Sequence, residues 1–173
     1  PAPVITSTTS LPINNKAQST TTATTSITVK NDDVICTKVS GGIEGQIEES
    51  INSVRTSHGL QKVVACKELR AAANAKYQDI VLQNNFTHSW ASGQVLQNVI
   101  RSHGYNPKDW GEILVEGSDF ASGSDYVAEW MTSPSHATII LTPKYTHVGV
   151  AVGAWTDEGV GVSIGVAEFG EAK

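Results

Sequence analysis

Histidine is the side chain with the widest chemical range in this sequence, and five histidines are present. Two of them, His136 and His147, lie on either side of an apolar run in the stretch SPSHATIILTPKYTHVGVAVGAW, residues 133–155. An imidazole can act near neutral pH as an acid, a base or a metal ligand. A lone histidine is more often structural, so the chemistry depends on which of the five meets a carboxylate in the folded chain.

The elements that must position these side chains are helices followed by strands. Apolar residues at three- and four-residue spacing predict four helices, over residues 43–58, 67–85, 93–104 and 124–134, the last with Ser124 as its N-cap. Residues 146–154 and 161–169 are rich in Val, Ile and Gly, and the TDEG between them predicts a hairpin turn. Helices that flank a small antiparallel sheet predict an α+β layer architecture.

Composition limits the classes of protein to which the chain can belong. With 173 residues, 39% of them hydrophobic, we expect one domain with a real core plus an extension. A net charge of -5 and a pI near 5.5 give no basic surface for nucleic acid, so we expect no nucleic-acid partner. Because no apolar run approaches the roughly 18 residues that span a bilayer, we expect no transmembrane segment. The oligomeric state cannot be predicted.

The first 28 residues differ from the rest of the chain. Residues 1–28 are rich in Ser and Thr with Pro and have no aromatic residue, which predicts a disordered tail or an O-glycosylated stalk. An unmodified polar linker fits the composition equally well. We expect residues 29–42 to be a linker arm and residues 43–173 to form the domain. Asn85 begins an Asn-Phe-Thr triplet, an acceptor sequence for N-glycosylation.

The two cysteines, Cys36 and Cys66, allow two interpretations. In an exported protein they would most simply form a disulfide that closes a loop of about 30 residues and contributes roughly 3 to 4 kcal/mol. As free buried thiols they would act as small apolar residues.

Several spaced motifs, in a fixed order, resemble those of the CAP superfamily, which includes cysteine-rich secretory proteins, antigen 5 and pathogenesis-related 1 proteins, and are most similar to its short bacterial SCP-domain form. They are FTH at 86–88, GY at 104–105, GE at 111–112, EWMTSPSH at 129–136, YTHVGVAVG at 145–153 and FG at 169–170. The resemblance covers about residues 43–170. It implies a three-layer αβα sandwich, secretion to the outside of the cell, and a surface cleft that carries His88, Glu112 and His136.

The chain departs from the family pattern around this cleft. Ser133 stands where eukaryotic members have a second cleft glutamate, and Glu129, one helical turn earlier, is the candidate that replaces it. Trp90 follows His88 by two residues and is a candidate for the cleft wall. The segment that carries sterols in some fungal relatives is reduced to five residues here, which argues against sterol binding by that loop.

Two imidazoles and a carboxylate suit a divalent metal such as zinc, with an open fourth coordination position. The resemblance favours a secreted binding module whose cleft holds a small ligand, a lipid or a metal ion bound by His88, Glu112 and His136. A metal-dependent hydrolase or protease that uses the same cleft is the first alternative, although no nucleophilic serine or cysteine stands in a recognisable motif. An adhesion protein that contacts a host or cell-surface component is the second.

Overall fold

The computed structural model describes residues 28–31, 34–37, 41–157 and 159–173. The predicted tail, residues 1–28, lies outside the described residues except for Thr28, and so does part of the predicted linker arm.

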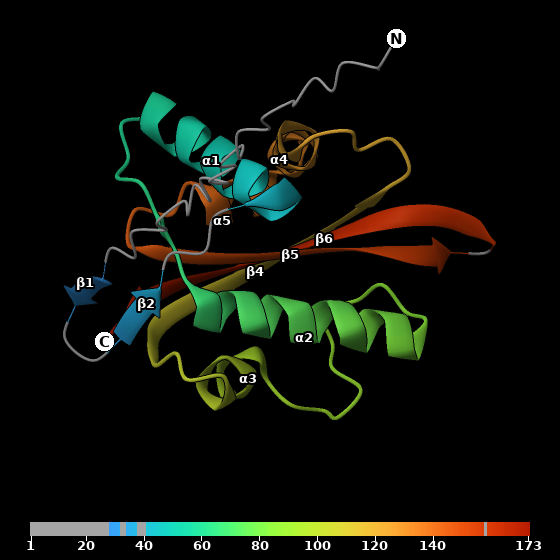
Figure 1. Ribbon diagram of the computed structural model, residues 1–173, viewed down its shortest axis with the longest axis horizontal. Helices are drawn as coiled ribbons and strands as arrows, with labels where there is room; N and C mark the ends of the chain where they lie inside the picture. The colour runs from blue at the N-terminus through green and yellow to red at the C-terminus, as the bar shows by residue number, and fades with distance from the viewer. Residues whose placement is uncertain (1–27, 32–33, 38–40, 158) are drawn as a thin grey trace, which may run out of the picture.

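A four-stranded sheet lies between two layers of helices (Figure 1). Its strands, in spatial order, are β3 (Val64–Ala65), β5 (His147–Asp157), β6 (Val160–Ala172) and β4 (Pro107–Gly117). One face of the sheet is covered by α1 (Gly42–Ser57), α4 (Gly123–Thr132) and α5 (Pro134–Ile140). The other face is covered by α2 (Lys67–Gln83) and α3 (Leu96–Ser102). The predicted αβα sandwich is confirmed.

The sheet is mixed, whereas the sequence predicts an antiparallel one. Strands β4, β6 and β5 are antiparallel neighbours, with β5 and β6 forming the predicted hairpin. Strand β3 pairs in parallel with β5, through Val64 and Ala65 opposite His147 and Val148. Two residues give no measurable alternation along the chain, so this short strand leaves no signal in the pattern.

Helices α1, α2 and α4 begin within one residue of their predicted starts, whereas α3 begins at Leu96, three residues after its predicted start, and the predicted cap of α4 is wrong. Ser124 lies inside the helix, and the N-cap is Ser122, two residues earlier. Asp125 accepts a hydrogen bond of 2.7 Å from the Ser122 backbone N–H, which completes a capping box. Pro134 ends the predicted helix and begins α5, because proline fits the first turn of a helix but not its interior.

Strand β4 was not predicted from the sequence. Its segment PKDWGEILVEG mixes charged and small residues, and only Ile113, Leu114 and Val115 give a continuous apolar run. Successive side chains of a strand point to opposite faces, so this run contributes to two hydrophobic clusters. Ile113 and Val115 pack toward α1 and α4, and Leu114 packs with residues of α2. Burial on both faces removes the polar alternation that identifies a one-sided strand.

Helix α2 lies directly on strand β5 at Gly149. A Cβ atom at this position would overlap the backbone of Leu69 and Arg70. Glycine is required here by the close approach of two backbones, and this contact fixes how deeply α2 sits on the sheet.

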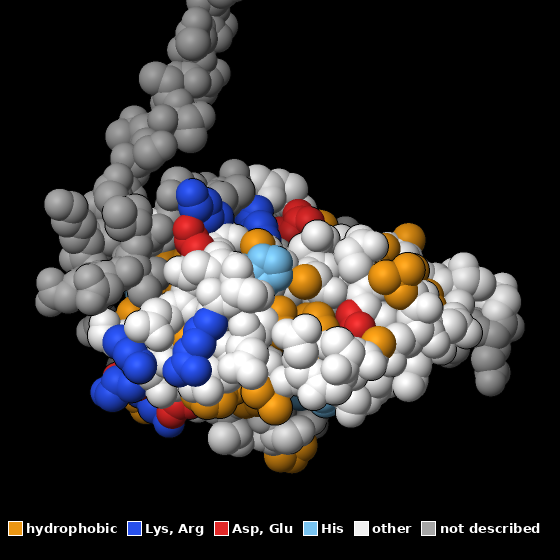
Figure 2. All heavy atoms as spheres, turned by 90° about the horizontal axis from the view of Figure 1, so that it is seen from below, with side chains coloured by type: hydrophobic (Ala, Val, Ile, Leu, Met, Phe, Trp, Pro, Cys, Tyr) orange, Lys and Arg blue, Asp and Glu red, His pale blue; other side chains and the backbone are white. Residues whose placement is uncertain are grey.

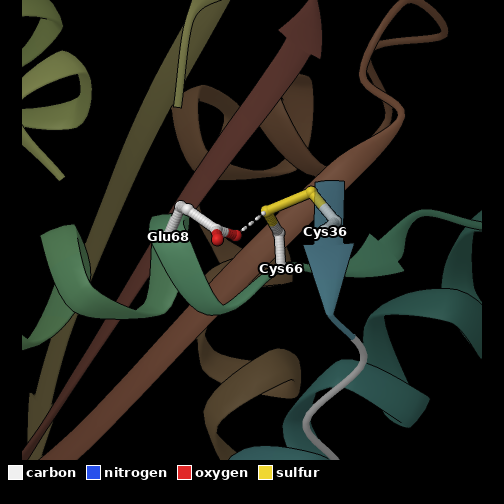
Figure 3. Close-up of side chains that lie close together, drawn as sticks. All are labelled: Cys36, Cys66 and Glu68. Atoms are coloured by element: carbon white, nitrogen blue, oxygen red, sulfur yellow. Dashed lines mark hydrogen bonds between the residues drawn. A yellow bond between two sulfur atoms is a disulfide. The ribbon is translucent and has the colours of Figure 1, made fainter. Parts of the chain in front are cut away.

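A disulfide joins Cys36 and Cys66, as predicted for an exported chain. Cys36 belongs to β2 (Val34–Thr37), which pairs antiparallel with β1 (Thr28–Asn31), and Cys66 is the N-cap of α2. The bridge therefore ties the small hairpin to the start of α2 (Figure 3). Glu68, in the first turn of α2, places its Oε2 atom 3.1 Å from Cys66 Sγ.

Arg55 joins α1 to the segment that follows α5. Its side chain is fully buried and donates to four backbone carbonyls, those of Gln61 at 2.9 Å, Ile140 at 2.6 Å, Thr142 at 3.0 Å and Tyr145 at 3.2 Å. These carbonyls lie at the end of α5 and in the loops, where backbone acceptors lack partners within a helix or sheet. The guanidinium thus holds the end of α5 and the loop before β5 against α1.

Candidate functional site

His88 and Glu112 form a direct contact. His88 lies in the loop after α2, and its Nδ1 is 2.6 Å from Oε1 of Glu112 in β4. The side chain of Glu112 is 6% exposed and that of His88 is 59% exposed. An ionised carboxylate accepts the Nδ1 hydrogen, which fixes the imidazole tautomer and leaves Nε2 available to a ligand.

His136 lies beside this pair. It is the third residue of α5, is half-buried, and follows the Ser-Pro pair that starts the helix. Burial, followed by the positive charge of His88, lowers the pKa of His136. The imidazole is therefore biased toward the neutral form that a metal ion or a hydrogen-bonding ligand requires.

The structure brings these three residues into one region but does not place them at coordination distance of one another. Within the described ranges, the ligand atoms that lie within 4.8 Å of one another belong to Cys36, Cys66 and Glu68, and both sulfurs are already in the disulfide. To hold one metal ion, the side chains of His88, Glu112 and His136 would have to move closer together. Assignment of the three as metal ligands stays a prediction.

The loop that carries His88 is anchored to α2 by Lys76. The Lys76 side chain is completely buried, and its Nζ donates to Ser89 O at 2.7 Å and to Asp79 Oδ2 at 3.3 Å. The same Nζ lies 4.7 Å from the centre of the Trp90 ring, within the range of a cation–π contact. Trp90, a predicted cleft-wall residue, is half-buried and packs on the apolar cluster under α2 and α3.

Two other predicted residues lie on exposed surface. Glu129 is exposed on α4, next to the buried Trp130. Asn85 is exposed just after α2, so its amide is accessible to a glycosylating enzyme; glycosylation stays a prediction. Neither position is among the hydrogen-bonded contacts of His88 and Glu112 described above.

Glu168 is the member of this region that sequence analysis missed. It stands directly opposite Glu112 in the β4–β6 register, and its side chain is fully buried. Burial raises the pKa of Glu168 well above its usual range; the neighbouring carboxyl group of Glu112 acts in the same direction, and the charge of Lys76 opposes them. The sequence contains one indication of this role. Glu168 is a charged residue within a mostly apolar part of β6, just as Lys76 is a charged residue on the buried face of α2.

His147 is buried at the start of β5 and has a structural role. It is 3% exposed, and its Nδ1 lies 3.0 Å from the Tyr105 hydroxyl and 2.9 Å from the Thr146 hydroxyl. Burial lowers the pKa of His147.

This burial predicts a loss of stability in acid. The folded-state pKa of His147 lies below the unfolded value of about 6.5, so protonation favours the unfolded chain. Its contribution to stability is present above pH 6.5 and is lost as pH falls through the folded pKa. In urea unfolding at pH 7.5 and 5.0, we expect His147→Gln, which cannot titrate, to lose less stability than the wild type. If the wild type and His147→Gln lose the same stability between pH 7.5 and 5.0, the imidazole of His147 does not cause the loss of stability in acid.

Two surface hollows occur elsewhere. One, of about 410 Å³, lies near the tip of the β5–β6 hairpin and is lined in part by Ser118, Trp155 and Ser163. The other, of about 310 Å³, lies between α2 and β5 and includes Glu44 and Arg70. Neither is lined by His88, Glu112 or His136.

Comparison with known proteins gives consistent matches over most of the chain. The family model described as cysteine-rich secretory protein family, CAP, matches residues 48–163. YkwD of Bacillus subtilis (strain 168) is 30% identical over 122 residues, which are 68% of this chain and 47% of YkwD. The chain therefore spans about half the length of this curated relative.

Solved structures share the fold at lower sequence identity. An outer surface protein from Borrelia burgdorferi matches with a TM-score of 0.63 and 21% identity, over 73% of this chain and 90% of that one. An extracellular protein with an SCP domain from Bacillus anthracis str. Ames matches with a TM-score of 0.64 and 19% identity, over 75% of this chain and 40% of that one. At these identities the likeness concerns the fold alone.

Proposed function

Because the chain belongs to the cysteine-rich secretory protein (CAP) family, we propose that it is an extracellular binding module whose ligand site is built on His88 and Glu112, with His136 beside them. The single observation that carries this proposal is the 2.6 Å contact between a largely exposed imidazole and a buried carboxylate. An exposed histidine held in one tautomer by a buried acid is a preorganised ligand, because its orientation is fixed before anything binds.

The donor chemistry favours a divalent cation such as zinc. The site offers Nε2 of His88 and the ring of His136, whose pKa is lowered, and nitrogen donors of this kind are common zinc ligands. Glu112 Oε2 is a buried oxygen with no hydrogen-bond partner among the described residues. An unsatisfied oxygen on a carboxylate that contacts the imidazole of His88 fits a cation, whereas a neutral apolar ligand would leave it unsatisfied.

A lipid chain has less support. Neither of the two hollows contains a site residue. On the face covered by α2 and α3, hydrophobic side chains are distributed among polar and charged ones (Figure 2). We therefore favour a small polar ligand or a metal ion over a lipid.

Secretion is supported by two observations. The family is one of secretory proteins, and a disulfide joins the two cysteines. Across the part of the chain that the structure describes, each helix is too short or too polar to cross a membrane.

Zinc binding is tested by titration calorimetry on the wild type and on three variants, His88→Ala, Glu112→Gln and His136→Ala. We expect each variant to bind zinc at least about tenfold more weakly, since loss of even an outer partner of a metal ligand typically costs 10- to 100-fold. Binding by the wild type should weaken in acid, at pH values below about 6.5, because burial lowers the pKa of His136 below the ordinary imidazole value and a protonated imidazole cannot coordinate a metal.

His58→Ala is the matched control. His58 is an exposed histidine at the C-terminal end of α1, where its Nδ1 lies 2.9 Å from Val54 O. This variant should keep the zinc affinity of the wild type. A wild-type protein that takes up no zinc, or a control that loses as much affinity as the three site variants, would reject the metal site.

A further inference from the structure

We propose that Lys76 and Asp79 are positioning residues of the same site: from one face of α2 they clamp the loop that carries His88. We call the pair the α2 clamp. Its consequence for ligand binding rests on the proposed function, whereas its effect on the loop does not.

The two side chains of the α2 clamp contact the loop on either side of Trp90. Lys76 Nζ donates to Ser89 O at 2.7 Å, and Asp79 Oδ1 accepts from the Ala91 backbone N–H at 3.3 Å. The ring of Trp90, between these two contacts, lies 4.7 Å from Lys76 Nζ. Residues three apart in a helix share a face, so both side chains reach the same short stretch of loop.

The α2 clamp is braced within its own helix. Asp79 Oδ2 accepts from Lys76 Nζ at 3.3 Å and from Gln83 Nε2 at 2.6 Å. The Lys76 side chain is 0% exposed and that of Asp79 is 14% exposed, so little water competes for these bonds. The two side chains are therefore held in place by each other as well as by the loop.

The backbone of the loop has few other ties. Within residues 86–94, all of which the structure describes, the one backbone–backbone hydrogen bond joins Gly93 N to Trp90 O at 2.9 Å and stays inside the loop. Two more backbone N–H groups donate to hydroxyl groups of the loop itself. Packing of Trp90 on the core adds attraction without direction, because the hydrophobic effect is non-directional. The path of the loop therefore depends on the α2 clamp.

The complete burial of Lys76 supports this assignment. Burial of a lysine costs free energy unless the group is paired, and the other buried residues of α2 are apolar: Leu69, Ala72, Ala73 and Ile80. A methionine would suit this face of the helix and occupy similar space. What the lysine adds is a bond to the loop carbonyl next to His88.

The α2 clamp and Glu112 together determine where the imidazole of His88 lies. Glu112 Oε1 lies 2.6 Å from His88 Nδ1 and orients the ring, while Lys76 holds the next residue, Ser89. Without the clamp, the loop samples positions from which the ring does not reach Glu112. A ligand binds only the competent fraction, so a fall of that fraction to about a tenth weakens the apparent affinity about tenfold.

The test compares Lys76→Met and Asp79→Ala with the wild type by zinc titration, amide hydrogen exchange and NMR of the His88 ring. Methionine keeps the apolar length of lysine without the donor, and alanine removes the acceptor of the Ala91 N–H. We expect each variant to bind zinc about tenfold more weakly, to lose the fixed Nδ1–H signal of His88, and to exchange the amides of residues 89–91 faster. A loss of global stability alone would change neither the ring signal of the folded protein nor the exchange of one loop.

The double variant and a matched control sharpen the test. Because Lys76 and Asp79 hold one segment, the double variant should lose less zinc affinity than the product of the two single losses. Lys67→Met makes the same substitution at an exposed lysine in the first turn of α2, and it should leave all three measurements unchanged.

The proposal is overturned if either single variant, with folding verified by circular dichroism, keeps the zinc affinity and the His88 signal of the wild type. It is also overturned if zinc affinity falls while the loop exchanges as in the wild type, or if Lys67→Met loses as much affinity. Should Lys76→Met not fold, Asp79→Ala decides, because Asp79 contacts Lys76, Gln83 and the loop.

The two proposals fail separately. If the wild type binds no zinc, the metal site is rejected, but amide exchange and the ring signal of His88 still report whether the α2 clamp positions the loop. If zinc binds and the clamp variants change nothing, the binding module stands without these positioning residues.

Discussion

Arg55→Met should lower the free energy of unfolding by about 3 kcal/mol or more, as measured by urea denaturation at neutral pH. The substitution keeps most of the apolar stem but leaves four carbonyls without their donor: those of Gln61, Ile140, Thr142 and Tyr145. Each buried carbonyl that loses its donor lowers the free energy of unfolding by about 1–3 kcal/mol. Water that enters the space and donates to some of these carbonyls makes the total loss smaller than the sum of the four. Arg55→Lys should give an intermediate loss, because a single ammonium cannot reach acceptors on both sides of a planar guanidinium.

Arg101→Met is the matched control, since Arg101 is exposed in the last turn of α3. A surface change of this kind should remain within about 0.5 kcal/mol of wild type. If both variants lose the same small amount of stability, the buried guanidinium is not the tie between α1 and the segment after α5.

The double variant Cys36→Ala/Cys66→Ala should lose about 3–4 kcal/mol of stability relative to the oxidised wild type. The bridge spans 30 residues of sequence, and most of its effect lies in the unfolded chain, whose ends it keeps together. Because the bridge also attaches the β1–β2 hairpin to α2, backbone amides of Val34 to Thr37 should exchange faster once the bridge is absent.

Non-reducing peptide mapping should recover Cys36 and Cys66 in one linked pair. Reduction of the wild type should reproduce the stability of the double variant, which separates loss of the bridge from loss of the two buried sulfur atoms. Two thiols that are alkylated in the native, freshly purified protein would refute the bridge.

Helices α1 to α4 and the β5–β6 hairpin could be predicted because their signal is local, whereas the seven-residue α5 was not predicted as a helix. The buried residues of α1, such as Ile47 and Ile51, recur at helical spacing, and the hairpin alternates around a short turn. The N-cap of α4 was misplaced because Ser122 and Ser124 are equally good capping residues by type. The carboxylate of Asp125 decides between them, and its hydrogen bond exists only in the folded turn.

The site was predictable only in part. His88, Glu112 and His136 were identified through family motifs, because β4, which carries Glu112, has no clear strand periodicity. The position of Glu168 opposite Glu112 follows from the β4–β6 register, which pairs residues 56 positions apart in the sequence. Local patterns hold no information about such a pairing, so a buried glutamate is visible in the sequence only as an anomaly.

The close approach of α2 to β5 at Gly149 affects how the chain tolerates mutation. No other side chain fits there, since even a methyl group would overlap the backbone of Leu69 and Arg70. Any substitution would lift α2, and with it Lys76 and the loop that carries His88. In a screen of all single substitutions for ligand binding, position 149 would therefore behave like a binding residue, although it has no side chain to offer a ligand.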